Sequence, residues 1–126
     1  MIYQLFIIGL GGFLGSISRY MLSKVIQEQA NSSFPWGTMA VNIIGSFIIG
    51  IIFALSVKNN ILPPVWRNFL AIGFCGGFTT FSSFSLDNYQ LLANNQLMFS
   101  LLYTLISVIL GFIFLYSGIL IVRVLT

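Results

Sequence analysis

The sequence predicts an all-α membrane protein with four transmembrane helices, and three observations carry that prediction. Of the 126 residues, 58% are hydrophobic and only 6% are charged, whereas a soluble domain carries about 25% charged residues. Four stretches contain no Asp, Glu, Lys, Arg or His: residues 1–18, 29–57, 68–86 and 88–122. Each stretch can hold the roughly 20 apolar residues that a helix needs to cross a bilayer. No segment shows the alternation of apolar and polar residues, over about ten positions, that marks a membrane-spanning strand.

The first two helices are placed by the residues at their ends. We expect the first to cover residues 2–26, which lack the basic start of a cleaved signal peptide. Its glycines suit close helix packing; they are Gly9, Gly11, Gly12 and Gly15. The second helix is expected over residues 34–57, because Pro35 suits a first helical turn and Trp36 suits the lipid headgroup boundary. It is followed by Lys58, Asn59 and Asn60.

The third helix, expected over residues 64–90, is predicted to be interrupted. Gly76-Gly77 followed by Thr79-Thr80 is poor helix-forming sequence, because glycine loses much backbone entropy and threonine is stiff at its branched β-carbon. Within a membrane, a broken helix is tolerated only where protein, water or an ion satisfies the freed backbone groups. The fourth helix is expected over residues 97–125, after a polar turn. We expect the whole chain, residues 1–126, to form one domain.

The inventory of reactive side chains excludes several classes of protein. The chain has no histidine, one cysteine (Cys75) and two carboxylates, Glu28 and Asp87. These residues cannot build a His/Cys/carboxylate metal site within one chain, or a serine or cysteine hydrolase with a histidine base. The net charge of +3 comes from basic residues that are spread singly along the sequence, so no patch could hold a nucleic acid. We therefore expect neither an enzyme nor a nucleic-acid-binding protein.

The size and charge pattern also bear on assembly. A bundle of four helices fills its own centre with side chains, so a solute path is expected at or beside an interface between subunits. With the N-terminus inside the cell, the basic residues divide three to two: Lys58, Arg67 and Arg123 lie inside, and Arg19 and Lys24 lie outside. This bias is too small to fix the topology. Two alternatives stay open, an antiparallel dimer of oppositely inserted copies and a single orientation set by the first helix.

The segment after the predicted break carries the first candidate site. Phe81 and Phe84 are three residues apart and so share a helix face, with Ser82 and Ser85 on a neighbouring face and Thr80 adding a hydroxyl. Such phenylalanines usually face lipid or the core. However, the edge of an aromatic ring is positive. Ring edges beside hydroxyl groups could replace part of the water shell of a small anion while binding it weakly, as conduction requires.

Polar residues elsewhere each admit more than one interpretation. Asn42 could form an interhelical hydrogen bond or direct its amide into an anion path. Tyr103 and Ser107, with Gly111, have four-residue spacing in the fourth helix and could form a second polar wall or only pack. Arg19 could reach the headgroups, concentrate anions in a vestibule, or pair with a helix C-terminus.

Two further features involve charge. The carbonyl groups at the interruption around Gly76-Gly77 are suitable ligands for a small cation such as Na⁺. The alternative is that these glycines only allow helices to pack closely. Asp87 would oppose an anion path if it were ionised at the mouth, and we favour a role as a pairing or boundary charge.

Three motifs together resemble the Fluc family of bacterial fluoride channels. They are Gly11-Gly12-x-x-Gly15-x-x-x-Arg19-Tyr20, Gly37-Thr38-x-x-x-Asn42-x-x-Gly45 and Gly73-x-x-Gly76-Gly77-x-Thr79-Thr80-Phe81-Ser82-Ser83-Phe84-Ser85. Their order and spacing and the length of the chain all agree with the family, and the third motif is highly specific.

The resemblance implies a passive exporter of cytoplasmic fluoride in the bacterial inner membrane. It implies an antiparallel, dual-topology homodimer with two pores and a central structural Na⁺. Backbone carbonyls of Gly76 and Thr79 from both subunits would bind the Na⁺, and Arg19 would lie in the vestibule. Asn42, Phe81 and Phe84 would be pore residues, and Ser82 and Ser85 would form a polar track beside the rings. From their hydroxyl groups we add Thr80, Tyr103 and Ser107 to the predicted pore set. The family often has glutamate where this chain has Asp87.

Two other classes of function are considered. Small multidrug transporters also have four short spans, and they exchange protons for cations through a carboxylate within the membrane, usually early in the chain. The first predicted helix has no carboxylate, and Glu28 falls in the following loop, which counts against that class. A purely structural assembly subunit is the third possibility. Conduction by the purified protein alone would distinguish a channel from such a subunit.

Overall fold

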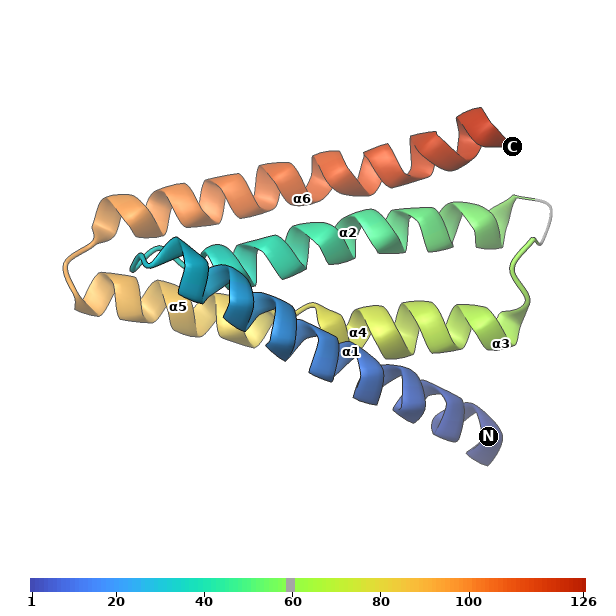
Figure 1. Cartoon of the computed structure of the whole chain (residues 1–126). Coiled ribbons are helices and arrows are strands. Elements are labelled where there is room, and N and C mark those ends of the chain that lie inside the picture. The colour runs from blue at the N-terminus through green and yellow to red at the C-terminus, as the bar shows by residue number, and fades with distance from the viewer. Residues whose placement is uncertain (59–60) are drawn as a thin grey trace.

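The computed structural model describes residues 1–58 and 61–126, and every regular element in that part of the chain is helical (Figure 1). Helices α1 (Ile2–Ala30), α2 (Trp36–Val57) and α6 (Leu97–Leu125) each form one span. The remaining span, Pro64–Ala93, consists of α3 (Pro64–Arg67), η1 (Asn68–Cys75), α4 (Gly76–Phe78) and α5 (Phe81–Ala93). All four spans are long and apolar enough to cross a membrane. The predicted all-α, four-span fold is therefore confirmed. Asn59 and Asn60, expected to help end the second helix, lie outside the described residues.

Helix α1 continues four residues beyond the predicted end, through the polar sequence that precedes α2. It ends where Asn31 adopts a left-handed conformation with φ 45°, and the Asn31 N–H donates to the carbonyl of Gln27. The side chain of Gln27 organises the turn: Nε2 donates to the carbonyls of Ser32 and Phe34, and Oε1 accepts from the N–H of Gly37. These hydrogen bonds stabilise a helical end that the hydropathy pattern alone does not indicate.

The interruption in the third span lies a few residues after the predicted glycine pair. Figure 1 shows α4 and α5 nearly in line, with a short non-helical link between them. Gly76 is helical, with φ −60° and ψ −37°. The link consists of Thr79 and Thr80, which both have extended backbones. The physical reason is that a β-branched threonine fits extended backbone well, whereas Gly77 remains helical and allows close contact with Gly12 and Ser16 of α1.

Glycines set how closely the spans approach one another. Helix α1 crosses the third span obliquely (Figure 1), and a Cβ added at Gly15 would collide with the carbonyl oxygen of Phe74. Helix α2 packs along α6, where a Cβ at Gly50 would collide with the carbonyl of Leu115. In both places backbone lies directly against backbone, as in the small-residue interfaces of membrane helices.

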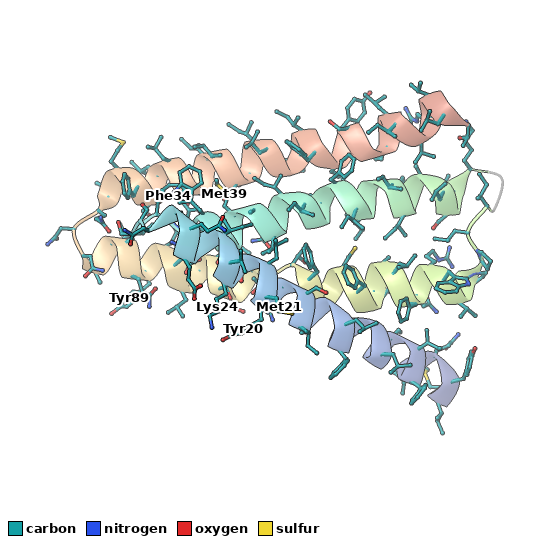
Figure 2. The ribbon with its side chains drawn as sticks, in the orientation of Figure 1. Tyr20, Met21, Lys24, Phe34, Met39 and Tyr89 are labelled. Carbon is teal, nitrogen blue, oxygen red and sulfur yellow. The ribbon has the colours of Figure 1, made fainter. Side chains whose placement is uncertain are left out.

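The most buried cluster lies at one end of the molecule. It contains Phe34, Met39, Leu91 and Tyr103, and Figure 2 shows Phe34 and Met39 at the end opposite the two chain termini. Most other large apolar side chains point outward, including many on α1 and α6. An apolar exterior of this extent suits contact with lipid, and the chain is a multi-pass membrane protein.

Candidate functional site

The amide of Asn42 on α2 holds the extended link of the third span. Its Oδ1 accepts a hydrogen bond from the N–H of Thr80 at 2.8 Å, and its Nδ2 donates to the carbonyl of Thr80 at 3.1 Å. These are the two backbone groups of Thr80, which lies outside both helical segments. The asparagine therefore replaces hydrogen bonds that a continuous helix would supply. Of the two readings of Asn42, the interhelical hydrogen bond is the one that the geometry displays.

The threonines of the link start one helical segment and end the other. Thr80 is the N-cap of α5, because its Oγ1 accepts from the N–H of Ser83 at 3.1 Å. The Thr80 hydroxyl also lies 3.3 Å from the Oγ of Ser82. Thr79 Oγ1 donates to the carbonyl of Cys75 at 2.9 Å. Side chains thus satisfy much of the backbone that the break exposes.

Arg19 reaches the same break from α1. Its Nε donates to the carbonyl of Gly77 at 2.9 Å, in a partly buried position. Gly77 lies in the last turn before the link, where a cation also complements the negative end of the helix dipole. Pairing with a helix C-terminus is therefore the alternative that this contact matches. The vestibule role of Arg19 stays a prediction.

Two carbonyls beside the link have no such partner. Among the described residues, no hydrogen-bond donor reaches the carbonyl oxygen of Gly76 or that of Thr79. Gly76 is exposed, and no atom lies within 4 Å of a Cβ built on it. Carbonyl oxygens are hard ligands of the kind that Na⁺ binds. The donor set therefore fits a small cation, provided that further oxygens complete its shell.

An open groove of about 420 Å³ lies beside the break, and most of the predicted site residues line it. From the predicted pore set it includes Asn42, Thr80, Phe81, Phe84 and Ser107, and from the predicted cation set Gly76 and Thr79. No charged side chain is part of its described lining. Because the groove is uncharged but contains hydroxyl, amide and aromatic groups, it can surround an ion without binding it strongly.

The two phenylalanines differ in their surroundings. Their ring centroids are 5.8 Å apart with an interplanar angle of 37°. Phe81 is 77% exposed, whereas Phe84 is partly buried and its ring lies 4.9 Å from that of Tyr103. Phe84 is therefore held by the protein, while Phe81 projects from the surface of the single chain.

The remaining predicted pore residues lie at different depths. Ser107 is one of the residues that line the groove, and its Oγ is buried and has no hydrogen-bond partner among the described residues. Ser85 is exposed and its hydroxyl donates to the carbonyl of Phe81 at 3.1 Å. Ser82 is exposed beside Thr80. Neither Ser82 nor Ser85 is part of the groove's described lining.

Tyr103 is fully buried and lies behind the groove instead of in it. Its hydroxyl donates to Oδ2 of Asp87 at 3.0 Å, and its ring packs edge to face against Phe34. This bond matches the pairing role favoured for Asp87. The tyrosine forms a buried support for the ring of Phe84, and the carboxylate satisfies its hydroxyl.

A second polar cluster, which the sequence motifs do not predict, joins α5 to α6. Oδ1 of Asn88 accepts from Ser100 Oγ at 2.7 Å and from Thr104 Oγ1 at 3.2 Å. Its Nδ2 donates to the carbonyl of Phe84 at 3.2 Å. The sequence feature that could have indicated this cluster is the four-residue spacing of Ser100 and Thr104. That spacing places both hydroxyls on one face of a mostly apolar helix.

Comparison with known proteins finds one matching family and relatives that share a single name. The family described as CrcB-like protein, Camphor Resistance (CrcB) matches residues 6–119. A protein of Flavobacterium psychrophilum named fluoride-specific ion channel FluC is 42% identical over 119 residues, which cover 94% of this chain and 96% of the relative. The protein of that name from Leptospira interrogans is 41% identical over 116 residues, covering 92% and 91%. One from Chlorobium phaeobacteroides is 46% identical over 112 residues, covering 89% and 86%.

These matches extend over nearly the whole chain, and they include all three motifs from which the resemblance was drawn. The predicted family is therefore confirmed: this chain belongs to the CrcB-like family.

Proposed function

We propose that this protein is a fluoride-selective ion channel, and not an enzyme, which exports cytoplasmic fluoride passively across the bacterial inner membrane. The relatives named fluoride-specific ion channel support the choice of ion. The observation that carries the proposal for this chain is the uncharged groove at the helix break. There Phe81 and Phe84 lie beside the hydroxyl of Ser107 and the link residue Thr80.

The chemistry of the groove suits a small anion that must lose water. Fluoride is small and strongly hydrated, so a narrow path has to replace its water with several donors at once. The groove offers the positive edges of two aromatic rings, the unpartnered hydroxyl of Ser107 and the amide nitrogen of Asn42, which carries two hydrogens. Each contact is weaker than an ion pair, and weak binding at several sites allows an ion to leave again. Larger anions such as chloride are excluded by size.

A second copy of the chain would complete the path. In the single chain the groove is open, and the ring of Phe81 is mostly exposed on its surface. We propose an antiparallel homodimer in which the partner covers this surface and encloses two pores. The three-to-two division of basic residues is compatible with insertion in both orientations.

A structural Na⁺ is proposed where the two broken helices of such a dimer meet. The carbonyls of Gly76 and Thr79 from each copy would supply four oxygens, and the bound cation would offset the desolvation of these groups. The cation would join the subunits and would not be transported. The absence of donors from the described residues to these two carbonyls supports the assignment.

Fluoride efflux from liposomes containing only the purified protein is the direct test. With internal K⁺ and the ionophore valinomycin to balance the charge that leaves, we expect vesicles loaded with potassium fluoride to empty rapidly. Vesicles loaded with potassium chloride should retain their anion, and protein-free vesicles are the control. Comparable rates for the two anions would contradict the selectivity, and no flux of either would favour a structural subunit. Efflux that requires an opposing proton gradient would favour an exchanger. The groove's described lining holds no carboxylate for such exchange.

The sodium proposal predicts a change in stability that does not depend on transport. The detergent-solubilised dimer should melt at a higher temperature in NaCl than in N-methylglucamine chloride of equal ionic strength, because a ligand that binds only the folded state stabilises it. A concentration of 100 times Kd would contribute about 2.7 kcal/mol. Melting followed by tryptophan fluorescence would measure this. Equal melting temperatures in the two salts, over a wide range of salt concentration, would contradict the site.

A further inference from the structure

Helix α5 carries both phenylalanines of the groove but has little apolar anchorage. Of its 13 residues, all of which the structure describes, only Leu91 is buried. Both Phe81 and Leu86 are largely exposed. From this helix, Leu91 belongs to the buried cluster and Phe84 packs against it. Because the apolar contacts are limited in this way, the polar bonds of α5 with its neighbours also help to fix its position.

Those bonds lie at the N-terminal end of the helix and in its middle. At its N-terminal end, the N-cap Thr80 is held by Asn42, as described above. About two turns later, Asn88 accepts hydrogen bonds from Ser100 and Thr104 of α6. Ser100 is 7% exposed, so its hydroxyl has little access to water. The amide of Asn88 is therefore a principal polar connection between α5 and α6.

The same amide is also connected to the backbone of a groove residue. Its Nδ2 donates to the carbonyl of Phe84, one turn earlier, at 3.2 Å. A rotation of α5 about its axis would break the bonds from Ser100 and Thr104, and it would move the ring of Phe84 off Tyr103. The two hydrogen bonds from α6 to Asn88 thus constrain the rotation of the helix that carries the ring, and the third fixes the Asn88 amide to the backbone of α5.

We propose that Asn88 is a positioning residue, which acts through α5 to hold the ring of Phe84 at the groove. Asn88 is absent from the groove's described lining, so it acts on the ring and not on the ion. The inference rests on the proposed fluoride conduction, because its effect is measured on that flux.

The test separates the rate of each channel from the number of working channels. Asn88→Ala and the double change Ser100→Ala/Thr104→Val break the same connection from opposite sides, and the triple variant combines them. At a low protein-to-lipid ratio, the fraction of vesicles that empty counts working channels, and the efflux rate of those vesicles measures each channel. We expect both variants to lower that rate about tenfold, because each removes both hydrogen bonds between Asn88 and α6. The fraction should be unchanged.

The triple variant should be no slower than either parent, because residues that act through one connection are not additive. Asn94→Ala is the matched control, since it removes an exposed asparagine at the C-terminal end of the same helix, and it should conduct at the wild-type rate. If Asn88→Ala fails to fold, the double variant tests the connection from α6. Wild-type rates in the variants, additive losses, or a lower fraction at an unchanged rate would overturn the proposal. An inactive wild-type protein would instead refute the proposed function.

Discussion

Replacing Phe81 with isoleucine is expected to reduce fluoride efflux by about a hundredfold or more, without preventing folding. The side chain is 77% exposed in the single chain, so it contributes little to the core. Isoleucine is similarly apolar, but it has no ring and therefore no positive edge to present to an anion. A loss of about 2.7 kcal/mol of stabilisation for the ion in transit corresponds to that hundredfold change. Efflux from proteoliposomes would measure it, and gel filtration would report folding and assembly.

Phe112→Ile provides a matched control for this substitution. Phe112 lies on α6, is 70% exposed and is absent from the groove's described lining. The same chemical change at this site should leave fluoride efflux at the wild-type rate. If Phe81→Ile also conducted normally, the ring of Phe81 would have no part in the mechanism.

The number and order of the spans could be predicted from the sequence because hydropathy determines them directly. Where the ends differ, the reason is a local hydrogen bond. Helix α1 reaches Ala30 because Gln27 and Asn31 satisfy the backbone of the turn, and hydropathy contains no information about such bonds. The interruption was predicted from the combination of glycine and threonine. It lies at Thr79 and Thr80 because Asn42, 38 residues before Thr80, pairs with the extended backbone.

The site could be predicted only in part for a similar reason. Residues close in sequence to the break, such as Phe81 and Phe84, were identified from a local motif. Asn88 was missed because its role depends on the register between α5 and α6, which places it opposite Ser100 and Thr104. That register depends on how two helices pack, and no short motif records it. Tyr103 is a predicted pore residue, but its ring lies behind the groove and supports Phe84. Its position depends on the same packing of α5 against α6.

The substitution Asn42→Leu is expected to lower the stability of the folded protein and to abolish fluoride efflux. Leucine has a similar size but makes neither of the two bonds to Thr80, so it leaves a backbone N–H and a carbonyl without partners within the membrane. Each unsatisfied group costs about 1–3 kcal/mol, so we expect the two groups together to cost about 2–6 kcal/mol of stability. Thermal melting in detergent would measure the stability, and proteoliposome efflux would measure the flux.

Two further variants help to distinguish a structural role of Asn42 from a role in anion binding alone. Ser56→Ala on the same helix removes a hydroxyl that bonds only the carbonyl of Ile52 among the described residues, so it should change neither quantity. Asn42→Gln keeps an amide donor and acceptor on a side chain one methylene longer, so its melting temperature should fall less than that of Asn42→Leu. If Asn42 served only as an anion donor, Asn42→Leu would stop the flux at an unchanged melting temperature. A joint loss of flux and stability would instead show that the amide maintains the open backbone on which the groove depends.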